Sequence, residues 1–388
     1  MRIAFLTTQV NLKTGGGSNL SPHLKATSMA LLGHQVSMFT FFPEKNSFFE
    51  KTAYSLIESP TRFKNWMALQ IKIFFLLRKH QNDFDIFVFE GEHFIWGAGL
   101  YRTLGGKTPV LLHFNGPVFS IYEHGTTYAA GHEVQKSLRT KISDGWRIFF
   151  EKNIGVHFAN HIDAFTISSP IMKDWMSDFG LNRDKIVVLS DFDDLEIFFK
   201  KSELVCSFDK SKTNIIYVGR LAPEKGVDTL LKALSEMENR KNIVVHIVGD
   251  GREKERLIKM SQEYKLEDSV VFYGWIDKQR LNGLYHDSDF FVHPARWAEP
   301  LGLTIPEAMA TGLPVIVPEV SGSAWAAGEA GITFKNGDYK DLKDKLKKMI
   351  DDKGLREGLA GHAEKEARRF EYRNSIKPLE NLLKKITS

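Results

Sequence analysis

Two series of short apolar runs constrain the fold of this 388-residue chain more than any other feature. Each run is rich in β-branched or aromatic residues, and longer stretches of helical pattern separate one run from the next. The first half contains RIAFLTT, QVSMFTFF, FDIFVFEGE, PVLLHFNG, DAFTISS and KIVVLS, and the second half contains TNIIYVGR, IVVHIVGDG, SVVFYGWI, DFFVHPA, LPVIVPE and GITF. Strands of a parallel sheet are apolar almost without interruption, because helices cover both faces of the sheet. The sequence therefore predicts an α/β fold with two doubly wound, Rossmann-like domains.

A polar, irregular segment at residues 190–213 separates the two series of runs. We therefore expect an N-terminal domain over residues 1–195 and a C-terminal domain over residues 196–365, each of ordinary domain size. The tail, residues 366–388, has a helical pattern and is expected to pack back on the N-terminal domain.

The composition limits the cellular compartment and the binding partners that are compatible with the sequence. Cys206 is the single cysteine, which excludes an intramolecular disulfide and fits a reducing compartment. The N-terminus, MRIAFLTTQV, reads as a first strand rather than a signal peptide, so we expect a cytoplasmic protein. A formal net charge of +4 permits an anionic ligand or membrane surface without requiring either. We expect no nucleic-acid partner, and the sequence does not predict the oligomeric state.

An apolar stretch at residues 66–77, WMALQIKIFFLL, is shorter than the run of about 18 residues that a membrane span needs. Lys72 also interrupts it. Two interpretations stay open, namely a buried helix and a basic amphipathic helix that faces a membrane or an acceptor. The second interpretation would place the protein peripherally at the inner face of a membrane.

The stretch IIYVGRLAPEKGVDTLLKAL, residues 215–234, has the pattern of an anion site. A strand ends near Gly219, a loop carries Arg220 and Lys225, and a helix follows Gly226. Two cations beside a helix N-terminus suit a diphosphate, since arginine offers several fixed donors and lysine a compact charge. Two solvated surface cations would give the same pattern.

Two glycine-rich stretches lack the complete fingerprint of a dinucleotide site. Gly15, Gly16 and Gly17 follow the first strand and would let the backbone approach a ligand closely. They form neither G-x-G-x-x-G nor a P-loop, and VGDG around Gly249 lacks the third glycine. We therefore expect no nicotinamide cofactor.

The stretch WAEPLGLTIPEAMATGLPV, residues 297–315, places Glu299 and Glu307 with seven residues between them. Glu307 opens a good helix-forming run. Carboxylates near a helix start can serve the helix dipole alone, or they can bind a ligand.

Five stretches, taken in their order along the chain, resemble the retaining glycosyltransferases of the GT-B fold that carry an E-x(7)-E motif, the family-four-like group. These stretches are Gly-Gly, VGRL..EKG, VGDG, VVFYGWI and EPLGLTIPEAMATGLPVI. The resemblance spans most of the chain and is strongest from residue 215 to residue 335. It implies transfer of a sugar from a UDP- or GDP-sugar to a carbohydrate or lipid-linked acceptor, in the synthesis of a surface polysaccharide or glycoconjugate. It implies no cofactor and no metal.

The resemblance also implies roles for individual residues. Glu307 would accept hydrogen bonds from the ribose, Glu299 would contact the donor sugar, and Arg220 with Lys225 would neutralise the diphosphate. His113, after a strand of the first domain, would contact the sugar near the reaction centre. The donor-binding positions implied in addition are Gly15, Gly16, Gly17, Gly219, Gly249, Trp275, Ile276, Leu301, Gly302, Leu303 and Thr304. Of these, Ile276 would hold the base through its backbone, Trp275 is a weaker candidate for stacking on it, and the amides of residues 301–304 would face the sugar and diphosphate.

Some positions depart from the family pattern or leave alternatives open. Ser190–Asp193, Leu301 and residues 321–325 differ from the residues usual there, so the donor is not specified. Asp287-Ser288-Asp289 matches a metal-binding Asp-x-Asp by letter, but we interpret it as a helix–strand connection. Residues 44–80 and 117–150 are the expected acceptor wall. A disaccharide synthase or phosphorylase of the same fold and a non-catalytic sugar-nucleotide-binding protein are the alternative functions.

Overall fold

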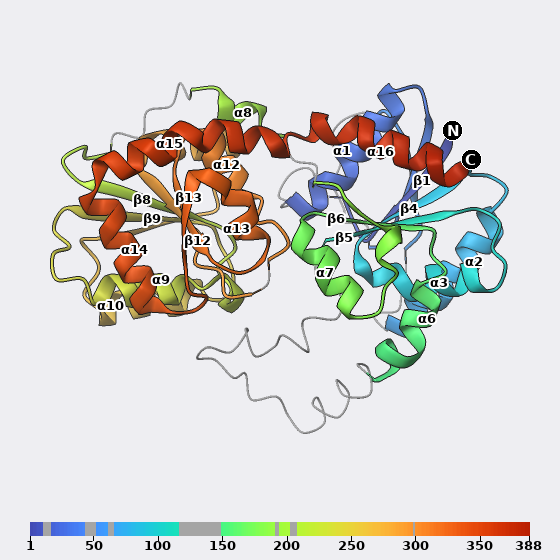
Figure 1. Ribbon diagram of the computed structural model, residues 1–388, viewed down its shortest axis with the longest axis horizontal. Coiled ribbons are helices and arrows are strands. Elements are labelled where there is room, and N and C mark those ends of the chain that lie inside the picture. The colour runs from blue at the N-terminus through green and yellow to red at the C-terminus, as the bar shows by residue number, and fades with distance from the viewer. Residues whose placement is uncertain are drawn as a thin grey trace. The chain divides into compact units, whose positions relative to one another are not determined.

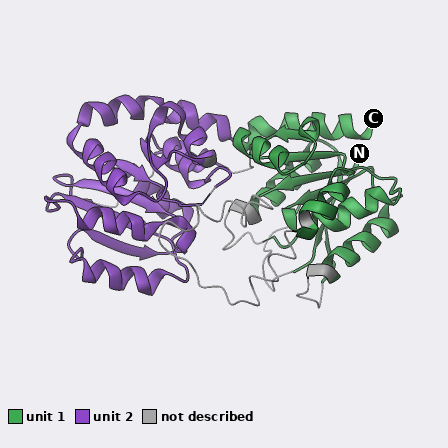
Figure 2. Cartoon of the chain, turned by 60° about the horizontal axis from the view of Figure 1, so that its bottom comes forward, with its two compact units in different colours: residues 1–123, 134–193, 372–388 green, residues 124–133, 194–371 purple. Residues whose placement is uncertain are grey.

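The computed structural model describes residues 1–10, 17–42, 52–60, 66–115, 149–190, 194–201, 208–297 and 299–388. Figure 1 shows the elements along the chain, and Figure 2 shows the two compact units into which it divides. Among the described residues, the first unit holds those numbered up to 190 together with Tyr372–Ser388, and the second holds those from Asp194 to Glu371.

The first unit is built on a seven-stranded sheet with the strand order β3-β2-β1-β4-β5-β6-β7, in which every pairing is parallel. Its strands are β1 (Arg2–Thr7), β2 (Gln35–Thr40), β3 (Ser55–Glu58), β4 (Ile86–Glu90), β5 (Val110–Phe114), β6 (Ala164–Ile167) and β7 (Ile186–Val188). Its helices are α1 (Gly17–Leu31), α2 (Trp66–His80), α3 (Ile95–Thr103), α6 (Val156–Ala159), α7 (Pro170–Asp178) and α16 (Tyr372–Thr387). It also contains the short 3-10 helices η1 (Glu92–Phe94) and η3 (Arg183–Lys185) and the π-helix η2 (Glu151–Gly155).

Successive residues of each strand enter two different cores, because side chains alternate across a sheet. On β1, Ala4 and Leu6 pack with α2, α3 and α7, whereas Ile3 and Phe5 pack with α1 and α16. Both faces are therefore covered, as the uninterrupted apolar runs predict. The sequence did not predict β3, which lies at the edge of the sheet and is largely exposed.

The second unit repeats this architecture with a six-stranded parallel sheet of order β10-β9-β8-β11-β12-β13. Its strands are β8 (Thr213–Val218), β9 (Ile243–Val248), β10 (Val270–Gly274), β11 (Phe290–Val292), β12 (Val315–Pro318) and β13 (Gly331–Phe334). Its helices are α8 (Glu196–Phe199), α9 (Val227–Ser235), α10 (Lys254–Glu263), α11 (Lys278–Asp287), α12 (Thr304–Ala310), α13 (Ser321–Ala327), α14 (Tyr339–Asp351) and α15 (Lys353–Ala367), with turns η4 (Pro223–Lys225), η5 (Gly328–Ala330) and η6 (Arg368–Phe370). The two doubly wound domains predicted from the sequence are confirmed.

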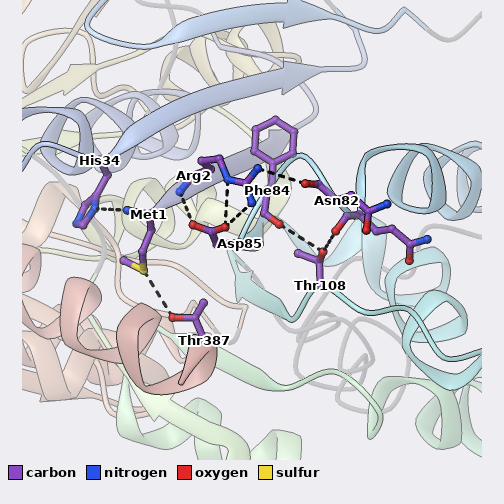
Figure 3. A network of polar contacts seen from close by, with 9 residues as sticks. Met1, Arg2, His34, Asn82, Phe84, Asp85, Thr108 and Thr387 are labelled. Atoms are coloured by element: carbon purple, nitrogen blue, oxygen red, sulfur yellow. Dashed lines mark hydrogen bonds and ion pairs between the residues drawn. The ribbon is translucent and has the colours of Figure 1, made fainter.

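The C-terminal helix belongs to the first unit. Leu379 and Leu383 of α16 are buried in the core that contains β1, β2 and β4. The helix begins at Tyr372 rather than at 366, because residues up to Phe370 complete α15 and η6, where Phe370 is buried in the core of the second unit. Figure 3 shows polar contacts near this end of the first unit, where Thr387 lies beside the sulfur of Met1 and Arg2 is paired with Asp85.

Two further expectations can be compared with the fold. Asp287 ends α11, and Asp289 accepts a hydrogen bond from the backbone of Asn214 just before β11, so the helix–strand interpretation of Asp287–Asp289 is confirmed. The apolar helix α2 is buried along one face, through residues such as Ile73, and exposed at Ile71 and Phe75. Membrane contact by its exposed face stays a prediction. None of the helices in the described part of the chain is long and apolar enough to cross a bilayer.

Candidate functional site

The loops that follow β8 and β11 in the second unit pack against each other, and this contact builds the candidate site. Gly226, which directly follows η4, has a φ of +66°, and a Cβ there would clash with the carbonyl oxygen of Pro294. The backbone N–H of Arg296 also donates to the carbonyl of Glu224 at 3.0 Å. Only glycine tolerates both this conformation and this approach. The packing brings Lys225, from one loop, to Glu299, from the other.

Lys225, Glu299 and His293 form a compact ionic cluster. The Nζ atom of Lys225 lies 2.5 Å from Oε1 of Glu299, and Nε2 of His293 lies 2.7 Å from Oε2. The side chains are 15%, 10% and 2% exposed, respectively. Each oxygen of the carboxylate therefore has its own partner, as a buried charge requires. The structure brings together two of the residues predicted as catalytic, Lys225 and Glu299.

Burial alone would raise the pKa of the Glu299 carboxyl. The charges of Lys225 and His293 and the hydrogen bonds from both outweigh burial and hold the pKa well below its ordinary value. Glu299 is thus an ionised carboxylate, which can accept hydrogen bonds from hydroxyl groups but cannot donate a proton.

Glu307 lies in the first turn of α12, 8% exposed, with the Tyr285 hydroxyl 3.4 Å from Oε2. The helix begins at Thr304, two residues after Gly302, whose φ of +80° lies in the left-handed region. Within the described residues, the backbone N–H groups of Gly302, Leu303 and Thr304 donate no hydrogen bond. Free amides at a helix start favour an anion. Contact of these amides with the donor stays a prediction. Leu301, whose amide belongs to the same predicted set, is 1% exposed.

Arg220 is placed differently from Lys225. Its guanidinium is 67% exposed and bonds Oε1 of Glu224 at 2.9 Å. The glycines beside it have a packing role. A Cβ at Gly219 would come within 2.7 Å of the buried Tyr217 hydroxyl, and a Cβ at Gly249 would clash with the Gly219 carbonyl. Donor binding by these glycines stays a prediction, because packing alone explains them.

Sequence reasoning missed three groups of this site. His293 ends the run DFFVH and could have been noticed as a polar residue at the carboxyl end of a strand. The other two are buried partners, Arg296 and Asp228, which are ion-paired, with Arg296 Nε also donating to Thr229 at 2.9 Å. They fix the loop that leads to Glu299, and their pairing depends on the fold rather than on any spacing.

The predicted base-binding residues follow β10. Trp275 is 60% exposed, and Ile276 is partly buried against the core of its unit. An exposed indole is available for stacking, but no described contact assigns it that role, and both residues remain predictions.

His113 lies in the first unit, at the carboxyl end of β5. It is 1% exposed, and its Nδ1 lies 3.0 Å from the Thr166 hydroxyl. On the neighbouring strand Glu90 stands opposite His113 in register, and Lys25 of α1 pairs with Glu90 at 2.8 Å. This buried pair was not predicted. Contact of His113 with a sugar stays a prediction.

Most of the other predicted positions of the first unit lie outside the residues that the structure describes. Gly15 and Gly16 lie outside the described residues, and Gly17 is the first residue of α1. Most of the expected acceptor wall, including residues 117–148, also lies outside them. Over the residues that are described, no group of three or more His, Cys, Asp or Glu side chains is arranged to hold a metal ion.

Two family models match consecutive parts of the chain. Glycosyltransferase Family 4 matches residues 15–196, and Glycosyl transferases group 1 matches residues 192–366. Together they span nearly the whole sequence, and the second contains all the residues of the ionic cluster.

Known proteins agree with these matches. An uncharacterised glycosyltransferase of Methanocaldococcus jannaschii is 23% identical over 325 residues, which cover 82% of this chain and 79% of that protein. A lipopolysaccharide core biosynthesis glycosyltransferase of Rhizobium meliloti is 27% identical over 216 residues, 53% of this chain and 59% of its own. Among solved structures, Anabaena HepE in complex with UDP superimposes with a TM-score of 0.75 at 17% identity, covering 99% of this chain and 100% of its own. At that identity the likeness shows the fold.

Proposed function

The chain belongs to the GT-B glycosyltransferases of the family-four type, and from this premise we propose that it transfers a sugar from a nucleoside-diphosphate sugar with retention of the anomeric configuration and without a metal ion. The acceptor class that we propose is a carbohydrate or lipid-linked carbohydrate, in the synthesis of a surface polysaccharide or glycoconjugate. The lipopolysaccharide relative from Rhizobium meliloti supports this acceptor class.

The ionic cluster at Glu299 is the observation that carries the proposal. An ionised carboxylate with hydrogen-bonding capacity beyond its two partners suits sugar hydroxyls. Beside it, Lys225 and the free amides at the start of α12 suit the departing diphosphate. We assign Glu307 to the ribose, since it is a second buried carboxylate, located in the first turn of α12. The UDP bound to Anabaena HepE supports a uridine nucleotide as the first donor to test.

The proposed reaction exchanges one bond at the anomeric carbon. The bond from that carbon to the β-phosphate oxygen breaks, and the acceptor oxygen bonds to the same face. The acceptor proton passes to the departing phosphate oxygen. Negative charge grows on the phosphate as the sugar leaves, so fixed cations and amides stabilise the transition state more than the ground state.

A nucleotide-release screen tests the proposal. The protein is incubated with a panel of UDP-, GDP- and ADP-sugars, with and without simple saccharide acceptors, and released nucleoside diphosphate is measured. We expect release from one donor class, and loss of release in Glu299→Gln. Proton NMR of the product then reads the anomeric configuration. Nucleotide binding without release from any donor would favour the non-catalytic alternative, and an inverted product would overturn retention.

A further inference from the structure

Two exposed arginines of the second unit share one buried carboxylate. Glu224 is 8% exposed. Its Oε1 faces Arg220 at 2.9 Å, and its Oε2 faces the guanidinium of Arg252 at 3.5 Å. The two arginine side chains are 67% and 70% exposed. A buried carboxylate needs charged or hydrogen-bonding partners, and both partners of Glu224 are guanidiniums that extend into solvent.

The loop after β9 is built to hold Arg252 in this place. Leu221 donates from its backbone to the carbonyl of Asp250 at 2.8 Å, and Glu253 donates back to the carbonyl of Leu221 at 3.1 Å. Gly251, between them, has a φ of +154°, and a Cβ there would clash with the Leu221 carbonyl. The loops after β8 and β9 are therefore joined backbone to backbone, and the backbone that carries Arg252 is held against the loop that carries Arg220.

The charges do not cancel. Two guanidiniums face one carboxylate, and among the described residues neither has a second carboxylate within ion-pairing distance. Each guanidinium has five N–H donors, of which Arg220 uses one on Glu224. The remaining donors face solvent with a net positive charge, which suits a group with several anionic oxygens.

We propose that Arg252 is a second phosphate-binding arginine of the sugar-donor site and that Glu224 holds it beside Arg220. The inference rests on the proposed function, because Arg220 belongs to the same loop as Lys225 and the pair would meet the phosphates of the donor nucleotide. Glu224 orients the two guanidiniums and does not itself contact the ligand, so it is a positioning residue.

Calorimetric titration with UDP and GDP tests Arg252 directly. The variants are Arg252→Ala, Arg252→Lys and a matched control, Lys259→Ala, which removes a cation that is 79% exposed on α10. We expect Arg252→Ala to weaken diphosphate binding roughly tenfold, the usual effect of losing a charged hydrogen bond. Arg252→Lys should lie between Ala and the unaltered protein, because it keeps the charge and loses the planar fork. The control should change affinity less than about twofold, as expected of a screened remote charge.

The possible outcomes distinguish the role of Arg252 from the proposed function. Equal affinities in Arg252→Ala and Lys259→Ala, with the unaltered protein binding UDP or GDP, would overturn the role of Arg252 and leave the proposed function intact. If the unaltered protein bound neither nucleotide, both would fall. We expect all variants to have equal melting temperatures, because the substituted side chains are exposed. Equal melting temperatures would exclude misfolding as the cause of any loss of nucleotide affinity.

Discussion

Glu299 and Glu307 differ in their surroundings although both are buried carboxylates of one motif. Glu299 is bonded to Lys225 and His293, which keep it ionised. Glu307 lies in the first turn of α12, with the phenol of Tyr285 near one oxygen. A carboxylate that only served the helix dipole would be solvated rather than enclosed by such partners. The two environments suggest two separate contacts with the donor.

Substitutions of the two glutamates should therefore impair nucleotide binding and sugar transfer in different ways. Glu307→Gln should weaken binding of the intact donor and of the free nucleoside diphosphate, because both contain the ribose. A charge-assisted hydrogen bond is worth about 1.5–3 kcal/mol, so roughly a tenfold or greater loss of affinity is expected. Glu299→Gln should leave diphosphate affinity nearly unchanged and depress transfer, because the free diphosphate contains no sugar for Glu299 to contact. Calorimetry with the diphosphate and a nucleotide-release assay on both variants make the comparison.

A merely structural role for the pair predicts another pattern. If both glutamates only stabilise the start of α12, each variant should lose thermal stability and keep its nucleotide affinity. Melting temperatures measured on the same two samples distinguish this pattern from donor recognition.

At the scale of elements, α12 is set between two glycines in the left-handed region. Gly302 has a φ of +80° before the helix, and Gly312 has a φ of +85° after it. A Cβ at Gly302 would lie 3.0 Å from Cδ1 of Ile305 and 3.4 Å from Nε2 of His293. A Cβ at Gly312 would have no atom within 4 Å. The two positions share a backbone conformation and differ in what surrounds them.

Gly302→Ala and Gly312→Ala form a matched pair for this reason. Each should lose about 1–2 kcal/mol of stability, the cost of a left-handed L-residue. Only Gly302→Ala should also depress transfer, because the added methyl group presses on the partner of Glu299 and on the first turn of α12. Denaturant unfolding and initial rates of nucleotide release measure the two effects. Equal rates in the two variants would contradict a role for the Gly302 turn in the site.

The helix α16, which packs in the first unit, contains a buried carboxylate, Glu380, with three basic partners. Glu380 accepts hydrogen bonds from Lys377 at 2.6 Å and faces Lys384 at 2.7 Å and His34 at 3.2 Å. The bonds from Lys377 and Lys384 outweigh burial and lower the pKa of the Glu380 carboxyl from 4.5 to about 2. A depressed carboxyl pKa stabilises the fold above the unfolded value, and this contribution disappears as the pH falls through the folded value.

Glu380→Gln should therefore lower the melting temperature at pH 7. The difference from the unaltered protein should narrow as the pH falls from about 4.5 toward about 2, since the native carboxylate then becomes protonated as well. Glu263→Gln, which changes a 61% exposed carboxylate of α10, is the control and should have little effect at either pH. A difference that stayed constant across this pH range would mean that the charge of Glu380 does not hold α16.

At the scale of the whole molecule, the proposed reaction assigns stabilisation of the leaving group to protein groups of the second unit alone. Lys225, Arg220, Arg252 and the amides at the start of α12 would carry that task. Transfer should then survive a strong chelator, and added Mg²⁺ or Mn²⁺ should not raise the rate. Nucleotide release with and without excess EDTA provides the measurement. Complete loss in chelator, restored by either ion, would refute metal independence.

Much of the fold could be predicted because its determinants are local. Twelve apolar runs mark twelve of the strands, since burial on both faces demands apolar residues in succession. Among the strands of the described residues, β3 lacks such a run, because it is an exposed edge strand and imposes no such demand. The E-x(7)-E stretch was informative for a similar reason. Its glycines and its helix start are set by backbone conformation, which sequence records directly.

The tertiary structure decided which charges meet. The spacing of residues in the sequence does not predict that Lys225 pairs with Glu299, or that Arg252 and Arg220 share Glu224. These contacts arise where parallel strands bring distant loops to the same edge of a sheet. The helix that ends the chain was predicted as a helix, but its place beside β1 follows from the burial of Leu379 and Leu383. Local sequence thus determined the elements and the glycine turns, because each depends on neighbouring residues. The ionic partners were decided only by the fold, because electrostatic pairing depends on distance in space rather than along the chain.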